Sequence, residues 1–218
     1  MSTFVLMKIL ESAPSRYDLG IKIITLGRIN RVYDRLVKSI KPGYSVLDIG
    51  CGTGNLTVRI LRKGAKVVAI DVNPDMIKIA KQKIEKSGFQ DSVKFREEGV
   101  SELSSESDSE YDAVVSGLCF SELSDDEQKY ALKQIYRILK PGGLLLLADE
   151  TQPNNFLKKM LHFMMKIPLT IITYLITQTT TSSLKNIDNM LRFAGFYIKS
   201  ADKNWIDDFI LLTAEKPF

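Results

Sequence analysis

The sequence predicts an α/β fold in which a Rossmann-like, doubly wound and mostly parallel sheet carries helices on both faces. Short apolar runs alternate with stretches of helical spacing along its 218 residues, as they do in such sheets. The first run ends at Asp48, and glycines follow at positions 50, 52 and 54. The second run, residues 67–70, ends at Asp71. An acid at the end of the second strand commonly grips a ribose, so this half of the chain is predicted to hold a nucleoside-containing ligand.

The composition limits the class of protein. Hydrophobic residues make up 44% of the chain and charged residues 26%, which is typical of a globular protein, and the length fits a single domain over residues 1–218. The net charge of +4 comes from scattered lysines, so no nucleic-acid partner is expected. Cys51 and Cys119 have neither disulfide nor metal-site spacing, and no signal peptide is visible. We therefore expect a cytoplasmic location and no metal site.

Residues 3–40 are predicted to form N-terminal helices, because apolar side chains between Leu19 and Ile40 recur at helical spacing. Gly20 and Gly27 weaken a single continuous helix. The helices could simply pack on the sheet, or the segment that begins at residues 16–18 could form a lid over the ligand.

The spacing of the three glycines bears on the identity of the ligand. A dinucleotide-binding turn has the pattern G-x-G-x-x-G, with a helix N-terminus that faces a pyrophosphate. Here the pattern is G-x-G-x-G, and the Asp48 carboxylate lies just before it. That carboxylate would repel a pyrophosphate but would suit an ammonium group. An NAD-dependent oxidoreductase is therefore the weaker alternative.

Residues 46–54, VLDIGCGTG, resemble motif I of the class I S-adenosylmethionine-dependent methyltransferases, whose usual form is V-L-D-x-G-C-G-x-G. The Lys-Pro-Gly-Gly turn at 140–143 is similar to another hallmark of that family. The resemblance implies a seven-stranded sheet with an antiparallel last strand. It also implies methyl transfer from S-adenosylmethionine, which leaves S-adenosylhomocysteine, to an unidentified acceptor that we expect to be a small molecule or a cofactor-related compound.

The same resemblance implies roles for individual residues. Asp48 would hold the methionine amino group, directly or through water, and Asp71 would take both ribose hydroxyls. The other implied cofactor-binding residues are Gly50, Gly52 and Gly54 at the methionine portion, Val72, Asn73 and Met76 beside the adenine, Gly99 and Val100 at the adenine edge, Ser116 after the fourth strand, and Tyr17 in the lid. No catalytic residue is assigned, because alignment of the acceptor and exclusion of water are the main requirements.

The adenine edge departs from the family pattern. Many members continue after the third strand with G-D-A-x-x-L, whose aspartate holds the adenine amino group. When Leu103 is aligned with that leucine, Gly99 takes the place of the aspartate. We expect backbone groups of Val100 to bind the adenine, with the Glu98 side chain as the alternative.

The middle of the chain supplies further elements in order. Asn73 starts a helix that Gly88 ends, and a short strand follows at 93–95. The serine and acid run at 104–110 has no apolar residue and is predicted to be a solvated loop. The next strand covers 111–115.

Beyond this strand, Ser124 and Glu127 form a capping box that opens a helix to residue 139. A strand at 144–148 ends in Asp149 and Glu150, which could orient an acceptor, bind a metal or be solvated. A helix at 183–194 and an antiparallel pair of strands at 196–200 and 209–214 close the fold.

An apolar helical insertion is expected at about 154–182. Lys166 and Pro168 interrupt its apolar run, which is too short to span a membrane, and Pro168 should divide it into two helices. Residues 156–176 could roof an apolar substrate pocket, make a weak membrane-surface or partner contact, or pack as core. We favour the roof.

Three further stretches, at 12–18, 116–123 and 177–181, are similar to the corrinoid protein-associated methyltransferases. That subgroup would make a corrinoid protein a partner. The alternative from another class is a non-catalytic protein that keeps the cofactor and docks on a membrane or a corrinoid protein through residues 156–176.

Overall fold

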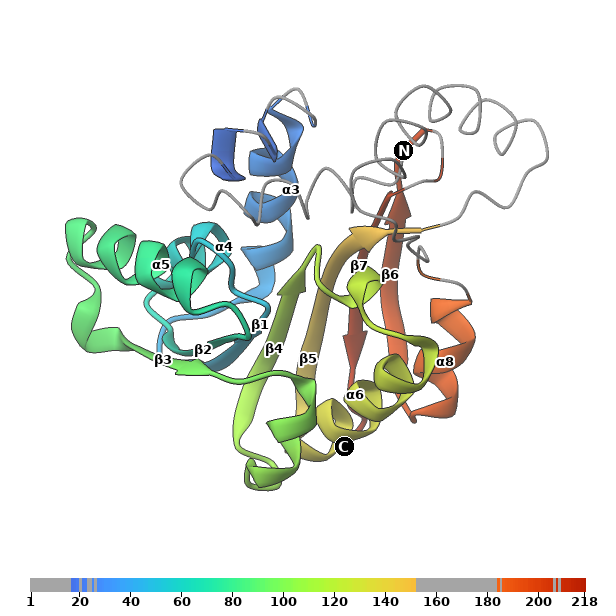
Figure 1. Cartoon of the computed structure of the whole chain (residues 1–218). Helices are drawn as coiled ribbons and strands as arrows, with labels where there is room; N and C mark the ends of the chain where they lie inside the picture. Colours follow the sequence, from blue (N-terminus) through green and yellow to red (C-terminus); the bar gives the residue numbers. More distant parts are fainter. Residues whose placement is uncertain are drawn as a thin grey trace.

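The computed structural model describes residues 17–19, 21–22, 25, 27–151, 184, 186–205, 207 and 209–218. Their strands form one seven-stranded sheet in the order β3-β2-β1-β4-β5-β7-β6 (Figure 1). Neighbouring strands from β3 to β5 are parallel, and β7 runs antiparallel to both β5 and β6. The predicted α/β fold, with its mostly parallel seven-stranded sheet and antiparallel last strand, is confirmed.

The strands and helices follow one another in the order that the sequence patterns indicate. The strands are β1 (Ser45–Ile49), β2 (Lys66–Asp71), β3 (Val93–Glu97), β4 (Tyr111–Gly117), β5 (Leu139–Glu150), β6 (Tyr197–Lys203) and β7 (Phe209–Glu215). The helices are α3 (Arg28–Leu36), α4 (Asn55–Leu61), α5 (Pro74–Lys86), α6 (Asp125–Ile138) and α8 (Ile187–Phe193), with 3-10 turns η1 (Val37–Ser39), η2 (Gln90–Ser92), η3 (Val100–Ser105) and η4 (Phe120–Glu122).

Helices cover both faces of the sheet, so the core has two layers (Figure 1). On one face α3, α4 and α5 pack on the sheet, and on the other face α6 and α8 do so. Alternate side chains of β1 serve the two layers, since Val46 packs with the first group and Leu47 with the second. Because both faces of the parallel strands are buried, their sequences are continuous apolar runs.

Two predicted helix starts are confirmed by their capping bonds. The Asn73 side chain accepts hydrogen bonds from the backbone N–H groups of Asp75 and Met76, and Pro74 takes the first helical position of α5. Ser124 and Glu127 form the expected capping box at the start of α6. Local sequence therefore fixes both starts.

Some boundaries differ from the prediction. Strand β5 begins at Leu139 rather than at 144, because Gly142 and Gly143 exchange backbone hydrogen bonds with Lys216 at 2.8 and 2.9 Å and extend the ladder. Helix α8 begins at Ile187, after Asn186 in the left-handed conformation.

The prediction of a wholly solvated loop at 104–110 is wrong for Glu106, whose residue surface is only 7% exposed. Its carboxylate pairs with Arg96 and accepts a hydrogen bond from the Tyr111 hydroxyl at 2.6 Å. Arg137 donates to the Glu106 carbonyl at 2.7 Å. These partners come from three other strands and helices, so nothing within the acidic run itself indicates the burial.

The expected insertion at 154–182, with its hinge at Pro168, lies outside the described residues, as does the N-terminal stretch 3–16. Within the part of the chain that is described, no helix has both the length and the apolar character that crossing a bilayer requires.

Candidate functional site

The glycine turn between β1 and α4 is held close to its neighbours. The backbone N–H groups of Gly50 and Cys51 donate to the carbonyl of Ile70 at 2.9 and 3.0 Å. Gly50 has φ +69°, and a Cβ there would lie 2.5 Å from both Cβ and Sγ of Cys119. A side chain would therefore collide with Cys119 in the segment after β4, which explains the glycine at this position.

Asp71 joins this turn to the start of α5. Its Oδ2 accepts from the backbone N–H of Gly52 at 2.7 Å, and its Oδ1 accepts from the N–H of Asn73 at 2.9 Å. The carboxylate thus sits where β1 and β2 both end. This is the edge at which doubly wound sheets hold their ligands.

Asp48 lies beneath the turn, fully buried, and lines neither of the cavities described below. One of its oxygens accepts from the Thr57 hydroxyl at 2.6 Å, and the other, Oδ1, has no hydrogen-bond partner among the described residues. Burial raises the pKa of Asp48 to about 7, the Thr57 bond opposes the rise, and the charge of Asp71 adds to it. An orphaned buried carboxylate oxygen fits a nearby cationic ligand group.

A cavity of about 470 Å³ opens at the carboxyl ends of β1, β2 and β4. It brings together most of the residues predicted to bind a cofactor: Tyr17, Gly50, Gly52, Asp71, Val72, Asn73, Met76, Gly99 and Val100. Gly54 does not line this cavity. It packs against α5 instead, since a Cβ on it would be 3.0 Å from the Cβ of Ala80. Ser116 is buried and donates to the carbonyl of Ile49 at 2.9 Å, so it joins β4 to β1 behind the cavity.

The cavity also contains residues that the sequence patterns did not assign to cofactor binding. Leu118, Cys119, Glu122 and Leu123 line it from the segment after β4, and Glu127 from α6. The first group directly follows the carboxyl end of β4, where doubly wound sheets hold their ligands, whereas the sequence predicts Glu127 only as a helix cap. Glu98 lines the cavity and pairs with Arg96 at 3.3 Å.

A second cavity of about 170 Å³ lies on the other side of the glycine turn. It shares Tyr17, Gly50, Gly52 and Gly117 with the larger cavity, and Tyr33 of α3 contributes to it. A Cβ on Gly117 would lie only 2.9 Å from Cε1 of Tyr33, so the glycine makes room for this ring. Burial, followed by the charges of Asp48 and Asp149, raises the pKa of Tyr33 well above its usual value. Its hydroxyl therefore stays protonated at neutral pH.

Of the interpretations offered for Asp149, solvation at a strand end is wrong, since the residue is 1% exposed. Its carboxylate accepts from the backbone N–H groups of Ser121 and Glu150 at 3.1 and 2.7 Å. Burial raises the pKa of Asp149 to about 6, and these hydrogen bonds oppose the rise. The residue thus fixes η4 against the end of β5.

The fold and the site together define a nucleoside-binding α/β protein of the methyltransferase type, and comparisons with known proteins agree. Residues 46–143 match a family described as a methyltransferase domain. The chain is 30% identical over 154 residues to the ubiquinone/menaquinone biosynthesis C-methyltransferase UbiE of Hahella chejuensis, an alignment that covers 68% of this chain and 60% of that protein. It is 30% identical over 152 residues to UbiE of Vibrio vulnificus, covering 67% and 57%.

Among solved structures, the 1,6-didemethyltoxoflavin-N1-methyltransferase of Burkholderia thailandensis, with bound substrate and S-adenosylhomocysteine, superposes with a TM-score of 0.67. That comparison covers 97% of this chain and 88% of the other, at 19% identity, and shows the shared fold. Residues 46–143 thus form a methyltransferase domain, and the chain as a whole has the fold of the class I S-adenosylmethionine-dependent methyltransferases. It spans about 60% of the length of the curated relatives it matches.

Proposed function

We propose that the protein transfers a methyl group from S-adenosylmethionine to a small-molecule acceptor. The observation that carries the proposal is the cavity of about 470 Å³ in which the glycine turn and Asp71 meet at the carboxyl ends of β1 and β2. Its volume suits a ligand with a nucleoside and a short amino-acid tail.

In this proposal the larger cavity holds the nucleoside, and the amino-acid end of the cofactor lies where the two cavities share Gly50 and Gly52. Asp71 would accept hydrogen bonds from the ribose hydroxyls, and Val72 and Met76 would pack on the adenine. The positively charged amino-acid end would lie over Gly50 and Gly52, above the orphaned oxygen of Asp48. The carboxylates supply the charge that such a cation needs.

When bound, the cofactor supplies a methyl group on a sulfonium sulfur, which keeps the electron pair of the broken carbon–sulfur bond. The residues of this chain act by position. The segment after β4 and the Tyr33 ring form walls beside Gly117, where both cavities meet. Walls of this kind align an acceptor and exclude water, and alignment can lower a barrier by about 7–11 kcal/mol.

The acceptor class is suggested by the relatives. The UbiE proteins are named as C-methyltransferases of ubiquinone and menaquinone biosynthesis, which favours a ring carbon of a quinone-related compound as the acceptor atom. A new carbon–carbon bond would form as the ring carbon takes the methyl group, and that carbon would then lose its proton. A corrinoid protein as partner, and a membrane-surface contact through residues 156–176, stay separate predictions.

Two measurements test the proposal. S-adenosylmethionine and S-adenosylhomocysteine should raise the melting temperature of the protein, whereas NAD should leave it unchanged. Radiolabel from the methyl group should then appear in a demethylated quinone precursor. Stabilisation by NAD alone would refute the cofactor assignment. Binding of S-adenosylmethionine without transfer to any small molecule would favour the non-catalytic alternative.

A further inference from the structure

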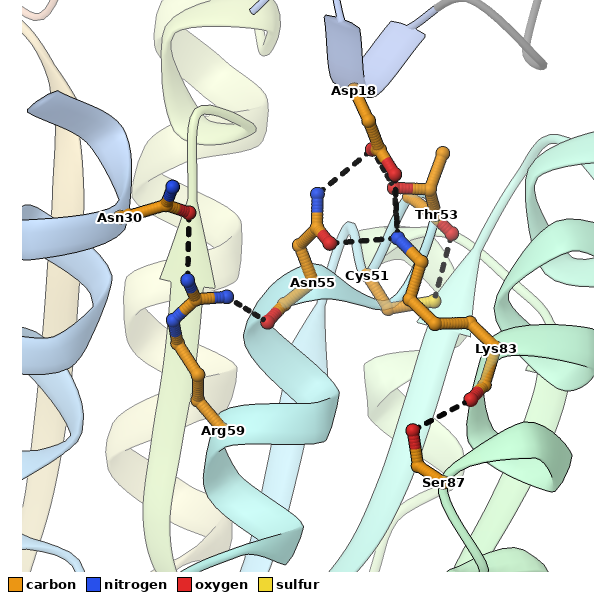
Figure 2. Close-up of polar contacts among 9 residues, drawn as sticks. Asp18, Asn30, Cys51, Thr53, Asn55, Arg59, Lys83 and Ser87 are labelled. Atoms are coloured by element: carbon orange, nitrogen blue, oxygen red, sulfur yellow. Dashed lines mark hydrogen bonds and ion pairs between the residues drawn. The ribbon is translucent and has the colours of Figure 1, made fainter. Parts of the chain in front are cut away.

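A cluster of four polar side chains joins three distant parts of the chain at the rim of the cavities (Figure 2). Asp18 comes from the N-terminal helical turn, Thr53 from the glycine turn, Asn55 from the start of α4, and Lys83 from α5. The Lys83 ammonium donates to Asp18 at 2.6 Å, to Asn55 at 2.7 Å and to Thr53 at 3.3 Å. Its three protons are thereby all used.

The Asp18 carboxylate is the other centre of this cluster. One oxygen accepts from Lys83, and the second accepts from the Thr53 hydroxyl and from Nδ2 of Asn55, the latter at 2.8 Å. Thr53 is 2% exposed, and the Lys83 side chain is 26% exposed. A half-buried network with several mutual hydrogen bonds holds its members more firmly than an isolated surface ion pair.

The packing of α5 brings Lys83 to this place. The backbone of Gly54 lies against Ala80, since a Cβ on the glycine would be only 3.2 Å from the Ala80 Cα. Lys83 follows Ala80 by three residues and therefore lies on the same face of the helix, one turn further on. The close approach of the glycine turn thus places the lysine beside the turn's own polar side chains.

Asp18, Thr53 and Asn55 line the smaller cavity, and Tyr17 lines both cavities, whereas Lys83 lines neither. We infer that Lys83 is a positioning residue for cofactor binding, a role that rests on the proposed function. Its ammonium holds the 17–19 turn on the glycine turn, and this contact keeps Tyr17 over the junction of the two cavities. Lys83 does not touch the cofactor and acts through Asp18 and Tyr17.

The experiment is a double-mutant cycle read by S-adenosylhomocysteine binding in calorimetry and by its dissociation rate. Lys83→Met keeps the aliphatic stem but removes the charge, and should weaken binding about tenfold or more, mainly through faster dissociation. In a Tyr17→Ala background, Lys83→Met should weaken S-adenosylhomocysteine binding less than about threefold, because the Tyr17 side chain that Lys83 positions is gone. Lys83→Arg should stay within about threefold of the wild type.

The matched control is Lys81→Met, a change at an exposed lysine two residues earlier on the same helix, which should alter binding less than about twofold. Urea unfolding establishes that each variant is folded. Equal effects of Lys83→Met with and without Tyr17, or no effect at all, would overturn the inference. If the wild-type protein bound neither S-adenosylmethionine nor S-adenosylhomocysteine, the proposed function itself would fail.

Discussion

Binding of the cofactor should release a proton from Asp48. The carboxyl is fully buried, burial raises its pKa to about 7, and one oxygen has no partner among the described residues. A cationic amino group placed over the glycine turn would stabilise the ionised form and lower this pKa. The group that was half protonated in the free protein would then lose its proton on binding.

The size of the effect follows from the titration of a single group. At pH 7 about half of the free protein carries the proton on Asp48, and a neighbouring cation typically lowers such a pKa by about 1–3 units. For a shift of about 2 units, about 0.5 proton per bound ligand should therefore be released at pH 7, and about 0.8 at pH 6. Asp149, with a pKa of about 6, is mostly ionised at pH 7. Proton release measured at pH 7 therefore comes mainly from Asp48.

Calorimetry with S-adenosylhomocysteine in buffers of different ionisation enthalpy measures the protons released. The observed enthalpy should vary with buffer ionisation enthalpy in the wild type, and hardly at all in Asp48→Asn, which keeps the shape and can still accept from Thr57. The same variant should gain stability relative to the wild type as the pH rises from about 4 to 7, because the raised pKa makes ionisation of the folded form costly. A buffer dependence that persists in Asp48→Asn would refute the reasoning.

Other predictions concern single contacts of the cavities. Asp71→Ala should weaken S-adenosylhomocysteine binding by about 1.5–3 kcal/mol, since a charge-assisted bond to the ribose is lost, while the exposed Asp75→Ala should not; equal affinities in calorimetry would remove the ribose assignment. Gly117→Ala should lower the free energy of unfolding by about 1–3 kcal/mol through overlap with Tyr33, and adding Tyr33→Ala should relieve part of that cost; strictly additive losses in urea unfolding would contradict the overlap. Glu98→Ala should change affinity less than about threefold, because an arginine already pairs with this carboxylate; a tenfold loss would identify Glu98, rather than backbone, as the group that reads adenine.

The parts of the site that the sequence predicts are those coded by adjacent residues. The glycine turn, the acid that ends β2 and the cap at Asn73 each depend on a few consecutive positions. The mostly parallel pairing of the strands follows because short apolar runs separated by helices favour parallel neighbours. For the same reason the residues named from these motifs gather at one edge of the sheet, where parallel strands end together.

The parts that the sequence leaves open depend on side chains that meet across long separations. Asp18 and Lys83 are 65 positions apart, and neither belongs to a pattern that indicates the other. Glu106 looks like one acid in a solvated run until Arg96 and Tyr111 are placed beside it. The sequence predicts that Asp48 binds the methionine amino group, but the glycine turn covers its side chain in the structure. Asp48 can therefore act on a ligand through its charge rather than through direct contact.

The charges around the two cavities complement one another in a way that suits a cationic ligand. Asp48, Asp71 and Glu122 bring carboxylates to the end of β1, to the end of β2 and to the wall after β4. Lys83 approaches the glycine turn, but Asp18 pairs with its ammonium at 2.6 Å. Because Lys83 is paired with Asp18, the carboxylates of Asp48, Asp71 and Glu122 would still attract a sulfonium and an ammonium group. In the proposed reaction, methyl transfer would turn the sulfonium into a neutral thioether. The same carboxylates would then attract the product less than the substrate, and this difference would help the product to leave.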